Sequence, residues 1–246
     1  GVYNRGTFTM ENVTISGNTA DYDGGGVYSY SGNFTMNGGT ISDNTATSGG
    51  GVYNYRGTVT MYGGTISGNT ASRNGGGVYN YGTLNLSGNS KIINNTKGTA
   101  GNLTPNNIYL LSDKTVTVAG ALTCEDASIG VTMQNYNGGT FATGGAAYIG
   151  KFVSDSSRYG IAVDSDNLAL KFQYTVTFDY GTLGKETKTV LSGETVTPPA
   201  PVFAGKVLVG WYTNSNFTTK FNFSNAIIVN KTIYAKFADY EDDKEA

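Results

Sequence analysis

The acidic residues that could perform catalysis occur as close pairs in this chain of 246 residues. Two carboxylates that face one bond can hydrolyse a glycoside, and clustered carboxylates can hold the calcium ion of a polysaccharide lyase. The chain contains no histidine, which excludes Ser-His-Asp, Cys-His and zinc-histidine chemistry. The candidate pairs are Asp21 with Asp23, Glu125 with Asp126, and Asp164 with Asp166.

The sequence around these pairs favours solvated turns over a catalytic or metal site. Asp21 and Asp23 lie in a segment that becomes Thr47-Ser48 one repeat later and Arg73-Asn74 in the next, so no acidic column builds up. Asp164-Ser165-Asp166 has the composition of a polar turn between two strands. We therefore predict no catalytic residue, no metal site and no cofactor. A polysaccharide lyase or hydrolase is the alternative hypothesis.

Tyrosines and asparagines also recur at regular spacing, because both belong to an internal repeat. The tripeptide Gly-Val-Tyr occurs at 1–3, 26–28, 51–53 and 77–79, at steps of 25, 25 and 26 residues. A second phrase, Thr-Ile-Ser-Gly-Asn-Thr-Ala, begins at Thr14 and recurs at 65–71, with one residue changed at 40–46, and in a worn form at 91–96. A fixed period of this length indicates a solenoid built from one structural unit per repeat.

The repeats are predicted to contain strands, because their apolar residues alternate with polar ones. The pattern of Phe8-Thr9-Met10 recurs at 34–36, 59–61 and 84–86. A unit of about 25 residues cannot bury its own apolar face, whereas coils stacked about 4.8 Å apart bury a continuous one. The sequence therefore predicts a mainly β fold, a parallel β-helix. Glycine triplets such as 24–26 should be its corners, since they lack the lysine and the helix of a phosphate-binding loop.

Stacking of the repeats would align the tyrosines in two outward columns. Alternation along the strands turns the tyrosines outward if the valines of Gly-Val-Tyr point inward. The first column would hold Tyr3, Tyr28, Tyr53 and Tyr79, and the second Arg5, Tyr30, Tyr55 and Tyr81. Stacked rings stabilise a solenoid by about 0.5–1.5 kcal/mol per pair, so one hypothesis gives the columns a structural role. The other makes them a platform for a sugar or protein, since tyrosine offers a large area and a hydroxyl at little entropic cost.

The same stacking would place one asparagine of each repeat above the next. We predict a structural ladder at a corner of the solenoid, in which each amide bonds its neighbour or the turn backbone. The predicted ladder consists of Asn18, Asn44, Asn69 and Asn95.

The regular repeats cover residues 1–98 of a β-helix predicted to span 1–172. Its remainder, 99–172, keeps strand patterns at 108–110, 116–118, 129–131, 161–163 and 168–170, and should form irregular closing coils. Composition changes at Gln173, where a short hinge should lead into a second domain, 173–237, with Trp211 in its core. Residues 238–246 are acidic, which is typical of a linker or tail.

Composition narrows the possible partners. The formal charge is −2 and no run of Lys or Arg is present, so no nucleic-acid partner is predicted. No apolar stretch approaches 18 residues, so no membrane insertion is expected in this segment. The single Cys124 cannot form an internal disulfide. Because residue 1 falls inside the repeat motif, we expect a piece of a longer protein whose further modules are its neighbours.

The repeats resemble those of large bacterial surface proteins. Segments such as Gly49–Asn54 and Gly63–Ala71 are similar to their Gly-Gly-Gly-Val-Tyr-Asn and Gly-Gly-Thr-Ile-Ser-Gly-Asn-Thr-Ala repeats. This resemblance implies a pectin-lyase-like, right-handed β-helix, an architecture shared with adhesins.

Residues 174–237 resemble the Listeria-Bacteroides repeat, an internalin B-repeat type of β-grasp-like module, through 174–179, 210–213 and 232–236. They depart from its pattern at 181–184, which replaces a double glycine, and at Phe237, which replaces a tryptophan. The resemblance implies an extracellular setting, on the bacterial cell surface or cell wall.

These observations predict a non-enzymatic module for adhesion or display. It would bind a host or environmental glycan or protein through a repetitive face of the β-helix. A purely structural stalk is a further alternative. The candidate ligand-binding residues are Tyr28, Tyr30, Tyr53, Tyr55, Tyr79 and Tyr81.

Overall fold

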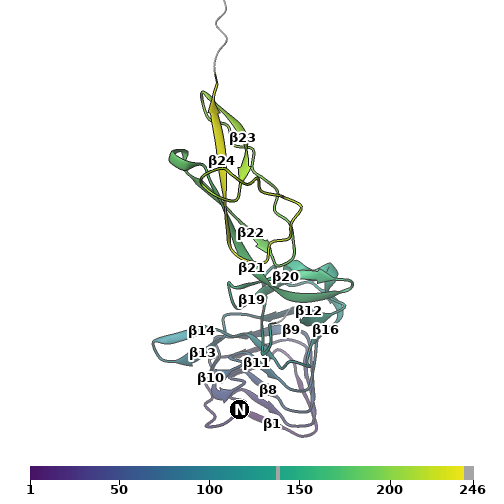
Figure 1. Ribbon diagram of the computed structural model, residues 1–246. Coiled ribbons are helices and arrows are strands. Elements are labelled where there is room, and N and C mark those ends of the chain that lie inside the picture. Colours follow the sequence, from purple (N-terminus) through teal and green to yellow (C-terminus); the bar gives the residue numbers. More distant parts are fainter. Residues whose placement is uncertain (137–138, 241–246) are drawn as a thin grey trace, which may run out of the picture. The chain divides into compact units, whose positions relative to one another are not determined.

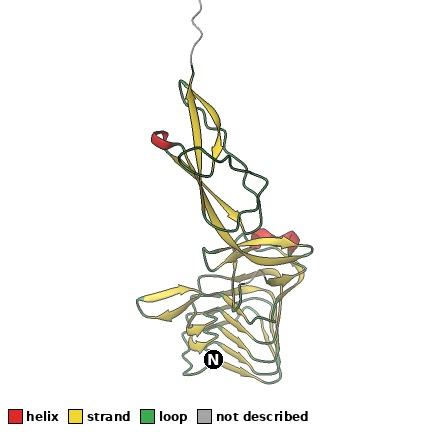
Figure 2. Ribbon diagram, in the orientation of Figure 1, coloured by secondary structure: helices red, strands yellow, loops and turns green. Residues whose placement is uncertain are grey.

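A computed structural model describes residues 1–136 and 139–240 of the chain. Strands make up 55% of it and helices 4%. Figure 2 shows the strands in yellow and the short helices in red. Within the described ranges, no helix is long and apolar enough to cross a membrane. Contacts divide the chain into two units, Gly1–Lys171 and Phe172–Ala246, and each unit has its own hydrophobic core. The first unit is a β-solenoid of about six turns, so the predicted mainly β solenoid is confirmed.

The strands of the first unit stack in rows, with one strand of each row per coil (Figure 1). The first row holds β1 (Val2–Asn4), β4 (Val27–Ser29), β8 (Val52–Asn54), β11 (Val78–Asn80), β15 (Ile108–Leu110), β17 (Ile129–Met133) and β19 (Phe152–Ser154). The second holds β2 (Thr7–Met10), β5 (Asn33–Met36), β9 (Thr58–Ser67), β12 (Thr83–Ile92), β16 (Val116–Leu122) and β18 (Thr140–Thr143). β3 (Thr14–Ser16) and β6 (Thr40–Ser42) stack in parallel on the second half of β9, where Thr40 pairs with Thr65. The third row holds β7 (Thr45–Ser48), β10 (Thr70–Asn74) and β13 (Thr96–Thr99).

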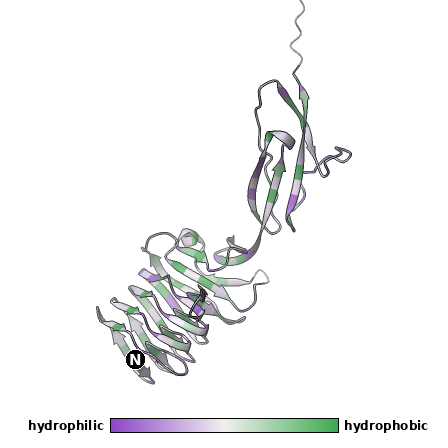
Figure 3. Cartoon of the chain, turned by 90° about the vertical axis from the view of Figure 1, so that its left-hand side faces the viewer, coloured by the Kyte–Doolittle hydropathy of each residue, from purple (hydrophilic) through white to green (hydrophobic). Residues whose placement is uncertain are grey.

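The register of the strands repeats the register of the sequence. In the first row, Val27 pairs with Val52, Val52 with Val78, and Val78 with Ile108, all in parallel strands. These four side chains are fully buried, and burial of each contributes about 1.5–3 kcal/mol. Figure 3 shows the hydrophobic positions recurring from strand to strand. The apolar alternation of the repeat thus forms one continuous core.

Glycines occupy the corner that leads into the first row because successive coils touch there. A Cβ atom on Gly50 would lie 2.5 Å from the carbonyl oxygen of Thr70 and 2.7 Å from that of Gly76. Gly49 before it has a φ of 63°, which glycine adopts without strain. The glycine triplets are therefore corners.

Antiparallel pairings close the solenoid after the regular repeats, and they were not predicted. β13 turns back into β14 (Asn102–Pro105), which forms the hairpin that projects from the stacked rows in Figure 1. After η1 (Ala146–Lys151) and β20 (Tyr159–Asp164), β21 (Asn167–Asp179) pairs antiparallel with β18. Residues 168–170, expected in an irregular closing coil, thus belong to the solenoid unit but run antiparallel to β18, because apolar alternation does not encode strand direction.

The second unit is a small sheet that begins within β21. β21 pairs antiparallel with β22 (Lys185–Leu191) and parallel with β24 (Lys231–Asp239), which pairs antiparallel with β23 (Lys206–Tyr212). The helix η2 (Gly181–Leu183) lies between β21 and β22. Trp211 is 8% exposed and its ring lies edge-on to Phe178 at 5.1 Å. The core role predicted for Trp211 is confirmed.

Some boundaries differ from those expected. Gln173, expected in a hinge, is a residue of β21 that pairs with Leu191. The predicted tail begins at 238, but β24 continues to Asp239, whose carboxylate forms an ion pair with Lys206. Residues 241–246 of that tail lie outside the described residues.

Candidate functional site

Tyrosines of the first row form a continuous column. Tyr3, Tyr28, Tyr53, Tyr79 and Tyr109 are aligned by the parallel register of β1, β4, β8, β11 and β15. Their successive ring centroids lie 5.3, 5.1, 5.0 and 5.2 Å apart. The structure thus brings together the four tyrosines of the first predicted column and adds Tyr109. Sequence reasoning missed Tyr109 because it lies outside the 25-residue period, although an apolar residue precedes it as in the repeat.

A second column runs beside the first. The ring of Tyr55 lies 5.4 Å from that of Tyr30 and 5.7 Å from that of Tyr81. Tyr53 and Tyr55 connect the columns at 6.4 Å. We name these residues together the tyrosine face: Tyr3, Tyr28, Tyr53, Tyr79 and Tyr109 of the first column, with Tyr30, Tyr55 and Tyr81 of the second.

Cations lie over the rings of the second column. They are Arg5 over Tyr30 at 4.8 Å, Arg56 over Tyr55 at 4.9 Å and Lys114 over Tyr81 at 5.8 Å. Arg5 thus occupies the place that the repeat gave it at the start of this column. Such contacts stabilise by about 0.5–1 kcal/mol at exposed sites. Arg5 and Arg56 also place positive charge beside the tyrosine face, whereas Lys114 is paired with Asp113 at 2.9 Å.

Neighbouring rings cover much of one another within the first column. The rings of Tyr28, Tyr53 and Tyr79 are stacked at 5.0–5.1 Å with planes 18° to 29° apart, whereas the end pairs with Tyr3 and Tyr109 are tilted by 34° and 33°. The interior rings are partly or largely buried, whereas Tyr3 and Tyr81, at the ends of the two columns, are 57% and 45% exposed. The middle of the tyrosine face therefore presents ring edges and hydroxyls rather than open ring faces.

The hydroxyls of the first column are held in the protonated form. Burial raises the pKa of Tyr28, Tyr53 and Tyr79, and the negative charge of Asp23 adds to this effect. The phenols therefore remain neutral at physiological pH and can both donate and accept hydrogen bonds.

A ladder of side-chain amides runs through the solenoid. Asn18 donates from Nδ2 to Oδ1 of Asn44 at 2.8 Å, Asn44 to Asn69 at 2.9 Å, and Asn69 to Asn95 at 2.9 Å. The row continues from Asn95 to Asn107 at 3.1 Å. Asn107 was not predicted because it directly precedes β15, whereas the other asparagines lie in the Thr-Ile-Ser-Gly-Asn phrase or, for Asn95, in its worn version.

The ladder ends on a carboxylate. Asn107 donates to Asp155 from Nδ2 at 2.5 Å and from its backbone N–H at 2.7 Å. Thr132 donates from Oγ1 to the same carboxylate at 2.7 Å. Burial raises the pKa of Asp155, and these hydrogen bonds oppose the shift. Each amide of the ladder donates to the next coil, so the last group must accept a hydrogen bond without donating one. An ionised carboxylate does this because it only accepts hydrogen bonds.

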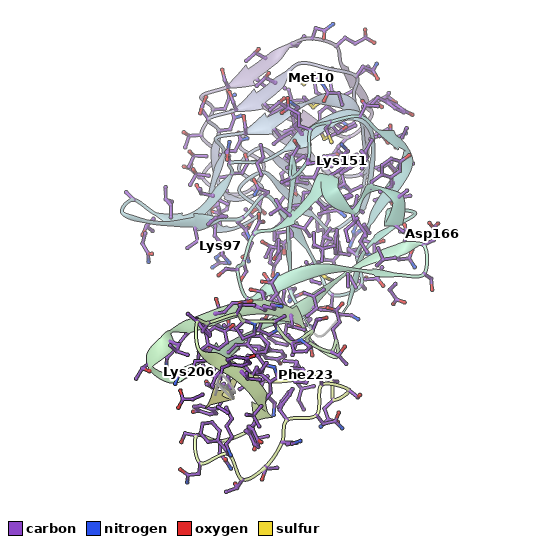
Figure 4. The ribbon with its side chains drawn as sticks, turned by 90° about the horizontal axis from the view of Figure 1, so that it is seen from above. Met10, Lys97, Lys151, Asp166, Lys206 and Phe223 are labelled. Atoms are coloured by element: carbon purple, nitrogen blue, oxygen red, sulfur yellow. The ribbon has the colours of Figure 1, made fainter. Side chains whose placement is uncertain are left out.

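The acidic residues do not gather into one site. Asp21 is exposed, Asp23 lies close enough to the first column to raise the pKa of its tyrosines, and the other two pairs lie elsewhere in ion pairs or turns. Glu125 pairs with Lys91 at 3.2 Å, and Asp126 with Lys151 at 2.9 Å. Asp164 ends β20, and Asp166, labelled in Figure 4, lies in the exposed turn before β21. Over residues 1–136 and 139–240, no group of three His, Cys, Asp or Glu residues is placed to hold a metal ion.

Comparison with protein families matches residues 174–236 to the Listeria-Bacteroides repeat domain. This match lies within the second unit. Comparison with curated proteins gave no match. Listeria-Bacteroides repeats occur in bacterial surface proteins. The combination of a β-solenoid with a segment similar to this repeat therefore indicates a surface or extracellular module.

Proposed function

We propose that this chain is an adhesion or display module of a larger secreted bacterial protein, and that the tyrosine face binds its ligand. The observation that carries the proposal is the pair of adjoining tyrosine columns, held in register by the strands beneath. Rigid positioning lowers the entropy lost on binding, so modest contacts along the columns can sum to a useful affinity.

The geometry of the rings favours a ligand rich in hydrogen-bonding groups. Sugar stacking needs open ring faces, and neighbouring rings cover most of these within the columns. The hydroxyls and ring edges instead suit repeated hydroxyl, amide or carbonyl groups of a host or environmental glycan or protein. The positive charges of Arg5 and Arg56 would attract acidic groups on that ligand.

Removal of hydroxyls without removal of rings tests this proposal. The triple variant Tyr28→Phe, Tyr53→Phe, Tyr79→Phe should keep the stack and lose three hydrogen-bonding groups. At about 1 kcal/mol per hydrogen bond, its affinity should fall roughly 100-fold. The measurement is binding to an array of host and plant glycans, mucin and matrix proteins.

Exposed tyrosines outside the tyrosine face provide the matched control. Tyr22 and Tyr62 are 83% and 57% exposed, and their change to Phe should leave every affinity intact. Tyr28→Ser, Tyr53→Ser, Tyr79→Ser removes the rings as well and should abolish binding. A folded Ser variant that retains all affinities of the parent chain would contradict the proposal.

The covered ring faces also favour a second function, a structural stalk. In a stalk the stacked rings and the amide ladder serve only to hold the coils together. The parent chain would then bind nothing on the array, and the Ser variant would show only a lower midpoint of thermal unfolding.

We further propose that the chain is not an enzyme. The ion pairs of Glu125 and Asp126, and the exposed turn at Asp166, support this. Incubation with pectin, alginate and chondroitin should release no product, and added calcium should leave thermal stability unchanged. Product release would favour the polysaccharide lyase or hydrolase instead.

A further inference from the structure

Adjoining cavities lie at the foot of the projecting β13–β14 hairpin. Their volumes are about 340 and 420 Å³, at the lower end of the range for small-molecule sites. Pro105 and Asp155 line both cavities. The first row leads to the smaller one, because Thr132, which lines it, pairs with Tyr109 at the end of the first tyrosine column.

The charges that line the smaller cavity are of opposite sign. Lys97, labelled in Figure 4, lies in β13 and donates from Nζ to Oδ1 of Asn74 at 3.0 Å. Asp155 supplies the negative charge, and its carboxylate is anchored by Asn107 and Thr132. Opposite charges of equal size favour a ligand without net charge over a simple anion or cation.

Unused hydrogen-bonding capacity also faces the smaller cavity. The hydroxyls of Thr104 and Ser157 make no hydrogen bond to the described part of the chain. A carboxylate has about four acceptor sites, and the contacts above occupy three on Asp155. Thus donors and an acceptor lie together around one space. A ligand with several neighbouring hydroxyls would satisfy them at once.

An aromatic wall completes the smaller cavity. Tyr136 lines it and stacks on Tyr159 at 4.0 Å, with ring planes only 8° apart. This stacking fixes the orientation of the Tyr136 ring. Tyr136 therefore adds an aromatic side chain to the cavity lined by Asp155 and Thr104, and this wall offers both apolar and polar contacts to a sugar.

We propose that this cavity binds a neutral saccharide unit. Asp155 accepts a hydrogen bond from a sugar hydroxyl, while Lys97, Thr104 and Ser157 bond the others, and Tyr136 contacts the apolar side of the ring. The site is distinct from the tyrosine face, whose residues do not line it.

A bulky side chain at the mouth of the smaller cavity tests whether this cavity binds the ligand and leaves the amide ladder intact. Ser157 is exposed, and Ser157→Trp should fill the cavity mouth. Arg158→Trp is the control, because it adds the same side chain to the same turn but lines neither cavity. Ligand-detected NMR with the full chain would screen neutral mono- and oligosaccharides, free amino acids and inorganic phosphate, and calorimetry would measure each hit.

A neutral saccharide should bind with a Kd of about 1 mM or tighter. Ser157→Trp should weaken it at least about tenfold, whereas Arg158→Trp should not, and both variants should unfold at the temperature of the parent chain. Thr104→Val should weaken it as well, and Thr99→Val, on the same hairpin but outside the cavities, should not.

Several results would overturn the proposal. One is a screen in which no neutral saccharide binds, or in which only amino acids or phosphate bind. Another is saccharide binding that survives Ser157→Trp. Binding that is lost in the Tyr28, Tyr53, Tyr79→Phe variant but kept in Ser157→Trp would assign the sugar to the tyrosine face. The two proposals can therefore fail separately.

Discussion

A buried asparagine can satisfy all its hydrogen-bonding groups only if the next coil supplies the right partner. Asn69 donates to Asn95 and to the carbonyl of Ile41, and its Oδ1 accepts from both the backbone and the side chain of Asn44. Asn54, in the first row, donates to Asn80 at 2.7 Å, but its buried Oδ1 has no hydrogen-bond partner among the described residues. A buried acceptor without a partner costs about 1–3 kcal/mol.

The missing partner is explained by Ser29. This residue pairs with Asn54 in the register, but its shorter side chain donates to the carbonyl of Gly32 instead. Ser29→Asn should supply an Nδ2 donor to Asn54, as Asn54 does to Asn80. We expect a gain of about 1 kcal/mol, or about 2–4 °C in the midpoint measured by circular dichroism.

A double-mutant cycle checks this cause. In an Asn54→Ala background the gain from Ser29→Asn should disappear, because its acceptor is gone. An equal effect of Ser29→Asn in both backgrounds would show that the stabilisation does not arise from this hydrogen bond.

The first tyrosine column should make the free energy of unfolding fall as the pH rises into the alkaline range. Burial raises the pKa of Tyr28, Tyr53 and Tyr79 above the ordinary value of 10.0, so the folded chain holds these protons more tightly than the unfolded chain. Their contribution to stability is therefore complete below pH 10 and is lost as the pH rises toward the folded-state values. Absorbance at 295 nm should show phenols that ionise only together with unfolding.

The variant Tyr28→Phe, Tyr53→Phe, Tyr79→Phe provides the control for that titration. It should lose the late-ionising signal and show a smaller decline in stability above pH 10. A parent chain whose phenols all ionise in one step centred on pH 10, before any unfolding, would contradict the prediction.

At the scale of strands and loops, the period of the sequence determined what could be predicted. Strands with equal spacing, such as β4, β8 and β11, follow from the repeat, and so do the columns and the ladder as far as Asn95. Beyond 96 the loops change length, so the alignment of Tyr109, Asn107 and Asp155 depends on tertiary structure rather than on period. The β13–β14 hairpin was missed for the same reason.

A glycine at a corner of the solenoid should tolerate substitution by alanine only where the neighbouring coil does not contact it. Gly50→Ala would place Cβ 2.5 Å from a backbone oxygen, and backbone atoms cannot move aside without disturbing the neighbouring coil. We expect a loss of roughly 3 kcal/mol. Gly6→Ala, where no atom lies within 4 Å of the added Cβ, should change stability by less than about 1 kcal/mol.

Urea denaturation of both glycine variants measures the difference. Equal stability of Gly50→Ala and Gly6→Ala would mean that the coils can separate at the corner without cost.

At the scale of the whole molecule, each unit has its own core, so the unfolding of each unit can be measured separately. The core of the solenoid includes Met61, and that of the second unit includes Phe178, both fully buried. The only tryptophan of the chain, Trp211, lies in the second core, whereas the stacked tyrosine columns belong to the first unit. Trp211 therefore reports on the second unit alone, whereas the stacked tyrosine columns dominate the tyrosine signal of the first unit although the second unit also contains tyrosines such as Tyr180.

We expect the two units to unfold independently, so that a substitution in one core changes the stability of that unit alone. Phe178→Ala should lower the free energy of unfolding followed by tryptophan fluorescence by about 3–5 kcal/mol. The unfolding midpoint of the stacked tyrosines, followed by near-ultraviolet circular dichroism, should not change. Met61→Ala should do the reverse, with a loss of about 2–5 kcal/mol. If either variant shifted both signals equally, the chain would unfold as a single cooperative unit.

The amide ladder gives the solenoid an electrical polarity. Each amide from Asn18 to Asn107 donates toward the next coil, so their dipoles align head to tail and add, as peptide dipoles do in a helix. The positive end of this row points at the carboxylate of Asp155, which stabilises its charge. Extra coils of the same repeat would lengthen the row without changing what its end requires. Coils of the repeat can therefore be added to the row only at its Asn18 end, because the Asp155 end accepts hydrogen bonds and does not donate them.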